Sequence, residues 1–60
     1  MMTYMIAHFE ALGTYIDLMR NGNEYYIYLK TNGFESPSRH IKDRNEATQL
    51  FNRMVAQLVK

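Results

Sequence analysis

The stretch TYIDLMRNGNEYYIYLKT, residues 14–31, holds two alternating runs of apolar and polar side chains on either side of Asn21-Gly22. An alternation with a period of two is typical of a half-buried β-strand. Asparagine and glycine both tolerate the positive φ angles that a two-residue hairpin turn requires. The sequence therefore predicts a hairpin of two antiparallel strands, over about 14–20 and 24–31.

The position of the turn sets the register between these two strands. A turn at Asn21-Gly22 places Tyr15 opposite Tyr28 across the hairpin. A turn at Gly22-Asn23 shifts the pairing but leaves the same side chains on each face, because the side-chain period is two. We expect the turn at Asn21-Gly22, since Asn-Gly is a strong short-range hairpin signal.

A further strand is expected over about 3–10, joined to the hairpin by a turn at Leu12-Gly13. An amphipathic helix over 4–12 is the alternative, but the apolar side chains there make no clean helical stripe. On the other side of the hairpin we expect a turn and loop over 31–38, because Pro37 excludes a central strand.

The last part of the chain predicts a helix over about 44–59. Asp43 is a candidate N-cap, and Glu46 follows three residues later, as in a capping box. The apolar side chains recur at the spacing of one helical face: these are Ala47, Leu50, Phe51, Met54, Val55, Leu58 and Val59.

These elements predict an α+β fold of class βββα, in which a three-stranded antiparallel meander is followed by one C-terminal helix packed on one face. We expect a single domain over residues 1–60. The sequence has no cysteine, so neither a disulfide nor a thiolate zinc site can stabilise it. His8 and His40 are its only histidines and lie far apart in sequence, so we expect no metal and no cofactor. Self-association is then the default way to stabilise so short a chain.

The first residues lack the basic region and long apolar run of a signal peptide, and no stretch approaches the ~18 apolar residues of a membrane span. We therefore expect no membrane association. The absence of cysteine suits a reducing compartment, and we expect a cytoplasmic location.

One helix covers one face of such a sheet, so the side chains on the other face need a separate explanation. That face is unusually rich in tyrosine and aliphatic side chains for a solvated surface. Its expected anchors for a partner protein, or for a second copy of the chain, are Tyr4, Ile6, Tyr15, Met19, Tyr26 and Tyr28. Tyrosine is enriched at interfaces. It is also a common strand former, so a purely structural role is the alternative.

His8 and Asp17 are expected to face each other on the same outer side of the sheet. The pair could act as a pH-sensitive contact or an acid–base dyad. A surface ion pair is the simpler interpretation, because a flat sheet offers no pocket that excludes water. No serine or lysine stands in a nucleophile context, and no catalytic residue or enzymatic activity is expected.

A short basic segment precedes the helix and enters its first turn: Arg39, His40, Lys42 and Arg44. Basic side chains beside the exposed amides of a helix N-terminus can hold a phosphate or an acidic side chain. A solvated loop is the alternative. Residues 36–60 carry five bases and two acids, whereas residues 1–35 carry two bases and four acids, so the positive charge lies in this half.

The meander followed by Asp43-Arg44-Asn45-Glu46-Ala47 and Phe51 resembles two groups of small proteins. One comprises short accessory proteins of bacteriophages and mobile elements, including anti-CRISPR inhibitors of host defence. The other is the AP2-like, arm-type DNA-binding domain of some integrases.

The first resemblance implies a non-enzymatic inhibitor or regulator that binds a host protein in the host cytoplasm. The second implies a nucleic-acid binder that uses the basic segment 39–44. An integrase-type domain would read DNA with an open sheet face lined by arginine and lysine. The expected outer face offers Lys30 against Glu10, Asp17 and Glu24, so we favour protein binding.

Overall fold

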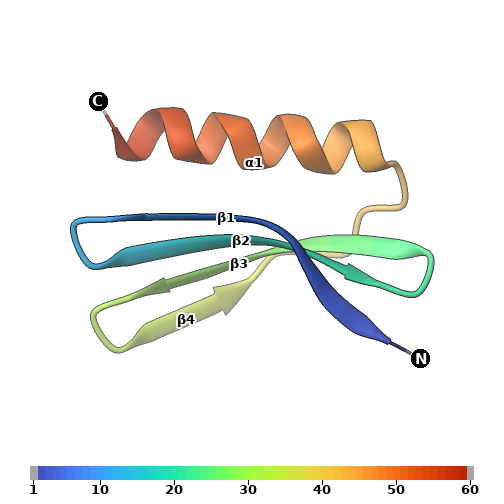
Figure 1. Ribbon diagram of the computed structural model, residues 1–60, viewed down its shortest axis with the longest axis horizontal. Helices are drawn as coiled ribbons and strands as arrows, with labels where there is room; N and C mark the ends of the chain where they lie inside the picture. Colours follow the sequence, from blue (N-terminus) through green and yellow to red (C-terminus); the bar gives the residue numbers. More distant parts are fainter. Residues whose placement is uncertain (1, 60) are drawn as a thin grey trace.

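The computed structural model describes residues 2–59 and shows one antiparallel sheet with a helix along one side (Figure 1). The sheet has four strands in chain order, and the helix contacts its two central strands. The elements are β1 (Thr3–Ala11), β2 (Thr14–Asn21), β3 (Glu24–Thr31), β4 (Phe34–Pro37) and α1 (Arg44–Leu58). The predicted antiparallel meander with a C-terminal helix is confirmed, but the predicted number of three strands is wrong.

The additional strand is β4, which lies in the stretch predicted to be a loop. It pairs with β3 through a two-residue turn, with Thr31 opposite Phe34. The turn residues Asn32 and Gly33 have φ angles of 33° and 78°, the two positive values that a type I′ turn requires. Pro37 is the last residue of this edge strand, a place where its missing N–H is tolerated.

The turn between β2 and β3 is displaced by one residue from its predicted place. Asn21 pairs with Glu24, so the loop residues are Gly22 and Asn23, and Gly22 has a φ of 65°. A glycine with positive φ at the first central position is typical of a type II′ turn. The expected pairing of Tyr15 with Tyr28 is therefore wrong, but the division of side chains between the faces is unchanged.

The N-terminal segment is a strand and turns at Leu12-Gly13, as predicted. The register between β1 and β2 shifts between Met5 and Ala7, so Ile6 is an extra residue in β1. Such a bulge bends the strand and changes the faces on which the preceding side chains lie. In Figure 1 the N-terminal part of β1 turns away from the line of the rest of the strand.

The bulge overturns the prediction that Tyr4 and Ile6 lie on the outer face. Ile6 is half-buried and packs against the core. Tyr4 pairs with Arg20 on the side that carries the helix, where its hydroxyl accepts a hydrogen bond from Arg20 Nη1 at 3.2 Å. Met5, which the unbroken alternation assigned to the core, pairs with Met19 and is half exposed on the opposite side.

Main-chain pairing continues beyond β4 and leads the chain to the helix. Ile41 exchanges two hydrogen bonds of 2.7 Å with Tyr25 of β3, and its side chain is buried. Between these points the amide of Ile27 donates to the hydroxyl of Ser38 at 2.8 Å, while the amide of Ser38 donates to the carbonyl of Ile27 at 2.7 Å. Ser38 thus supplies a side-chain acceptor where the regular ladder is interrupted.

The core lies between α1 and the covered face of the sheet. Its buried side chains are Ile16, Leu18, Tyr25, Ile27, Ile41, Ala47 and Phe51. The helix begins after Asp43, whose carboxylate accepts from the amide of Glu46 at 3.3 Å, so the predicted N-cap is confirmed. The predicted apolar stripe contributes to the core except at Val59, which lies past the helix and is exposed.

Candidate functional site

The face of the sheet opposite α1 is the candidate functional site, and we call it the outer face. Its residues follow from the register of the four strands. They are Thr3, Met5, His8, Glu10, Tyr15, Asp17, Met19, Asn21, Glu24, Tyr26, Tyr28, Lys30, Glu35 and Pro37. Paired residues form rows that cross the sheet, and the rows differ in chemistry.

One row is apolar and joins Met5 of β1, Met19 of β2 and Tyr26 of β3. We call it the apolar row. Met5 is 50% exposed, and both Met19 and Tyr26 remain partly accessible. Methionine adapts its shape to a contacting surface, and tyrosine presents a large, stiff one. The row therefore offers contact area that the chain's own helix does not cover.

His40 extends the apolar row beyond β3. Its ring stacks on Tyr26, with ring centres 5.3 Å apart and planes inclined by 16°. Its Nδ1 atom lies 2.8 Å from Glu24 Oε1, so the ring is held from two directions. The sequence placed His40 in the basic segment, whereas the structure places it beside the tyrosine of the outer face.

The next row is polar and joins His8, Asp17, Tyr28 and Pro37. His8 Nδ1 lies 2.5 Å from Asp17 Oδ1, which confirms the predicted opposition of these two residues. The hydrogen bond to Asp17 raises the pKa of His8 above its ordinary value, and the negative charges of Asp17 and Glu10 act in the same direction. The pair lies on an open face, as a surface ion pair does.

The row nearest the Leu12-Gly13 turn carries most of the charge, joining Glu10, Tyr15, Lys30 and Glu35. Lys30 Nζ lies 3.9 Å from Glu35 Oε2. Glu35 also accepts a hydrogen bond from the Tyr28 hydroxyl, which raises the pKa of that phenol. The charge of β4 thus holds Tyr28 in place from the edge of the sheet.

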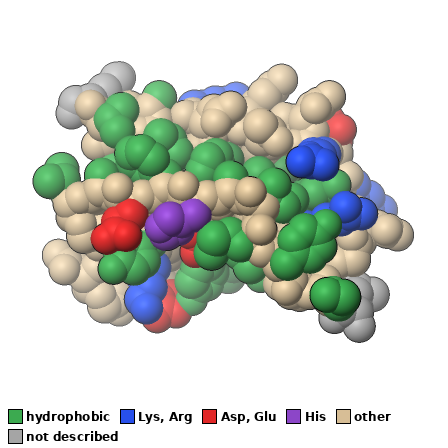
Figure 2. All heavy atoms as spheres, in the orientation of Figure 1, with side chains coloured by type: hydrophobic (Ala, Val, Ile, Leu, Met, Phe, Trp, Pro, Cys, Tyr) green, Lys and Arg blue, Asp and Glu red, His purple; other side chains and the backbone are tan. Residues whose placement is uncertain are grey.

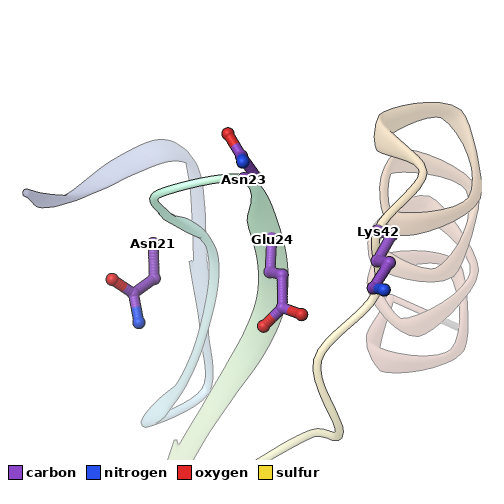
Figure 3. A pocket seen from close by; sticks show the side chains of 4 residues that line it. All are labelled: Asn21, Asn23, Glu24 and Lys42. Atoms are coloured by element: carbon purple, nitrogen blue, oxygen red, sulfur yellow. The ribbon is translucent and has the colours of Figure 1, made fainter. Parts of the chain in front are cut away.

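A polar pocket lies at the opposite end of the outer face, beside the apolar row (Figure 3). Asn21 and Asn23 line it from the β2–β3 turn, Glu24 from the start of β3, and Lys42 from the segment before α1. In Figure 3 the side chain of Glu24 lies between those of Asn21 and Lys42. The pocket offers amide, carboxylate and ammonium groups, which suit a polar side chain at the rim of a contact.

The predicted basic segment does not form one patch. Ile41 is buried in its middle, His40 joins the outer face and Lys42 faces the polar pocket. Arg39 and Arg44 are exposed. An anion at this place would meet Glu24 beside Lys42, which reduces the attraction that the four basic residues suggest in sequence.

Four of the six predicted anchors lie on the outer face: Tyr15, Met19, Tyr26 and Tyr28. Sequence reasoning did not place Met5, Glu35 or His40 on this face, although it named His40 as a secondary contact in the basic segment. The Asn32-Gly33 turn was a readable signal for β4 and therefore for Glu35. The residues around Ile6 contain no signal that predicts the bulge, which brings Met5 to this face.

Comparisons with protein-family models, with curated proteins and with solved structures gave no match. Among the described residues, no helix is long and apolar enough to cross a membrane. Within residues 2–59, no three His, Asp or Glu side chains gather in a way that could hold a metal ion.

Proposed function

We propose that the chain is a non-enzymatic protein-binding module that docks through the apolar row of its outer face. The observation that carries this proposal is the continuous run of Met5, Met19 and Tyr26 across three strands, on the side of the sheet that α1 does not cover. Exposed apolar patches rimmed by polar groups mark interaction sites on small proteins.

The groups around the row support docking of a protein surface. Stacking on His40 and the hydrogen bond to Glu35 hold Tyr26 and Tyr28 in fixed orientations. A side chain that is already ordered loses less entropy on binding. The row is flanked by polar residues on both sides, which matches the apolar centre and polar rim of protein interfaces.

In line with the resemblance to phage-encoded accessory proteins, the partner in this proposal is a protein of a bacterial host, such as a defence component, and binding inhibits or regulates it. The outer face then acts through occlusion of the partner's surface. This assignment needs no catalytic group on the chain.

The test is affinity capture from host lysate with the wild-type chain and with Tyr26→Ser combined with Met19→Ser. Removing two central anchors of an interface typically costs more than about 2 kcal/mol, which is a loss of about 30-fold in affinity. We expect a protein captured by the wild type, then expressed and purified, to bind the double variant at least that much more weakly in calorimetry.

Phe34→Ser is the matched control. Phe34 is 59% exposed but lies on the side of the sheet that carries the helix. The substitution therefore removes an accessible aromatic ring and leaves the outer face unchanged. Partner binding that is lost with Phe34→Ser and kept with the double variant would contradict the proposal. Circular dichroism of each variant checks that the fold is retained.

A further inference from the structure

Apart from the bulge at Ile6, the free edge of β1 lacks the features that protect edge strands. Natural sheets blunt exposed edges with lysine, proline, β-bulges or very short strands. Between Thr3 and Ala11 the strand has no lysine, arginine or proline. In Figure 2, which looks onto this edge, a band of main chain runs between hydrophobic side chains on the helix side and acidic and histidine side chains below. The opposite edge, β4, has four residues and ends in Pro37.

The main-chain groups that β1 offers to a new strand follow from its hairpin. The closing pair of a two-residue hairpin is hydrogen-bonded, and bonded pairs then alternate along the ladder. Ala11 and Thr14 close this hairpin. The amides and carbonyls of His8 and Glu10 therefore point away from β2, toward the free edge.

The regular part of this edge is short and has a defined centre. It is bounded by the bulge at Ile6 and by the turn at Leu12-Gly13, so it comprises residues 7–11. Phe9 lies in the middle, with one outward-pointing residue, His8 or Glu10, on each side of it. If β1 of a second copy pairs antiparallel here, it presents the same outward-pointing main-chain groups, on either side of its own Phe9.

We propose that two copies of the chain pair antiparallel through β1 about a two-fold axis at Phe9, which joins their sheets into one. In this register His8 lies opposite the partner's Glu10, and Glu10 lies opposite the partner's His8. Each of these two pairs exchanges two main-chain hydrogen bonds, because the groups concerned are those that point outward.

The side chains of the paired residues are complementary. His8 Nδ1 is engaged by Asp17 at 2.5 Å, whereas Nε2 lies 3.8 Å from Glu10 of the same chain, too far for a hydrogen bond. Nε2 is thus available to donate to the partner's Glu10. Opposite charges placed directly across two strands stabilise their pairing, whereas like charges there destabilise it.

A second copy fits this edge better than an arbitrary peptide, for two reasons. The pairing brings the half-buried Phe9 beside its counterpart, on the side that carries both helices. Assembly also stops at two copies, because β1 of each chain is consumed and β4 offers only a short edge without the Pro37 amide.

The experiment is sedimentation of the full chain from about 10 µM to about 1 mM, with Glu10→Pro and Glu35→Pro as matched variants. Both replace a glutamate whose main-chain amide points to the free edge of the sheet, one on β1 and the other on β4. We expect the wild type and Glu35→Pro to dimerise, and Glu10→Pro to dimerise at least about tenfold more weakly, equivalent to about 1.4 kcal/mol.

A mixture of isotope-labelled and unlabelled chains reads the register without any substitution. Phe9 faces its counterpart in a non-bonded pair, where the α-protons of two strands come closest, so we expect a cross-peak between Phe9 α-protons of different chains. Glu10→Gln, which keeps the amide, tests the charge if Glu10→Pro fails to fold, and it should also weaken the dimer. A wild-type chain that stays monomeric at about 1 mM overturns the proposal, as does a dimer without this cross-peak. Neither result affects capture of a partner through Met19 and Tyr26.

Discussion

His8 Nδ1 of β1 lies 2.5 Å from Asp17 Oδ1 of β2, on the outer face of the sheet. The side chain of Asp17 is 16% exposed and that of His8 is 41% exposed. Because Glu10 lies nearby as well, His8 is surrounded by negative charge, which favours its protonated form. This contact links the stability of the first hairpin to pH.

The stability of the chain should fall as the pH rises through the pKa of His8. That pKa is raised in the folded state, chiefly by the hydrogen bond to Asp17. The folded chain therefore binds the proton more tightly than the unfolded chain does. The contribution is fully present below about 6.5, the ordinary value, and is lost as the pH passes the raised value. Urea unfolding from about pH 5.5 to about pH 9 measures the change.

The control for this effect is His8→Gln, which retains His40 and every carboxylate. The difference in unfolding free energy between the wild type and this variant isolates the contribution of His8. Asp17→Asn should bring the pKa of His8 back toward its ordinary value in an NMR titration. An unchanged titration curve in Asp17→Asn would show that the hydrogen bond to Asp17 does not cause the shift.

Replacement of Leu12 by asparagine should stabilise the chain. Leu12 has a φ of 54° and is 94% exposed, so it accepts an unfavourable backbone conformation without burying its side chain. Asparagine tolerates this conformation and would precede Gly13 as in a favoured type I′ turn. We expect a gain of about 0.5 to 1 kcal/mol, seen as a rise of the melting temperature by a few degrees in calorimetry.

Leu12→Val is the opposite control, because a β-branched residue is least tolerant of positive φ. It should lower the melting temperature. If Leu12→Asn were destabilising, the exposed leucine would have to make a contact that the conformation of the turn does not reveal.

Removal of the N-cap should weaken α1. The carboxylate of Asp43 accepts from the amide of Glu46, and both the hydrogen bond and the negative charge favour the start of a helix. Asp43→Ala should cost about 1 kcal/mol of unfolding free energy, whereas Asp43→Asn keeps the acceptor and should cost less. Equal losses in the two variants in urea unfolding would contradict this order.

The parts of the fold that were predictable depend on local patterns. A short window of sequence contains the repeat that predicts the apolar stripe of α1 and the one that predicts the alternation of β2 and β3. The Asp43 cap is a local signal too, because it depends on the residues that begin the helix. The site was predictable to the same extent, since the alternation of side chains along β3 is enough to place Tyr26 and Tyr28 on the outer face. The error in the position of the turn did not change these faces, because both candidate loops have two residues.

The parts that were missed depend on pairing partners. The bulge at Ile6 exists only relative to β2, and it exchanges the faces of Tyr4 and Met5. His40 reaches the outer face because Ile41 is drawn into the core against Tyr25. Such consequences of tertiary contact have no local signature. The loop assigned around Pro37 is different, because Asn32-Gly33 is a hairpin signal that was present and outweighed by the proline.

Ser38 gives the most specific test of how the chain passes from the sheet to the helix. Its hydroxyl accepts from the amide of Ile27 at 2.8 Å and donates to the carbonyl of Arg39 at 2.9 Å. Ile27 is only 1% exposed, so its amide has little access to water if that acceptor is removed. Ser38→Ala should therefore cost about 1 to 3 kcal/mol, the penalty for leaving a buried donor unpaired. Ser38→Thr keeps the hydroxyl and should recover most of the loss in urea unfolding.

Hydrogen exchange locates the effect: the amide of Ile27 should exchange faster in Ser38→Ala, relative to global unfolding, while that of Leu18 in the neighbouring strand should not. Equal acceleration at both amides would mean that Ser38 stabilises the whole fold through another contact, and the proposed role of its hydroxyl as a substitute acceptor would be wrong.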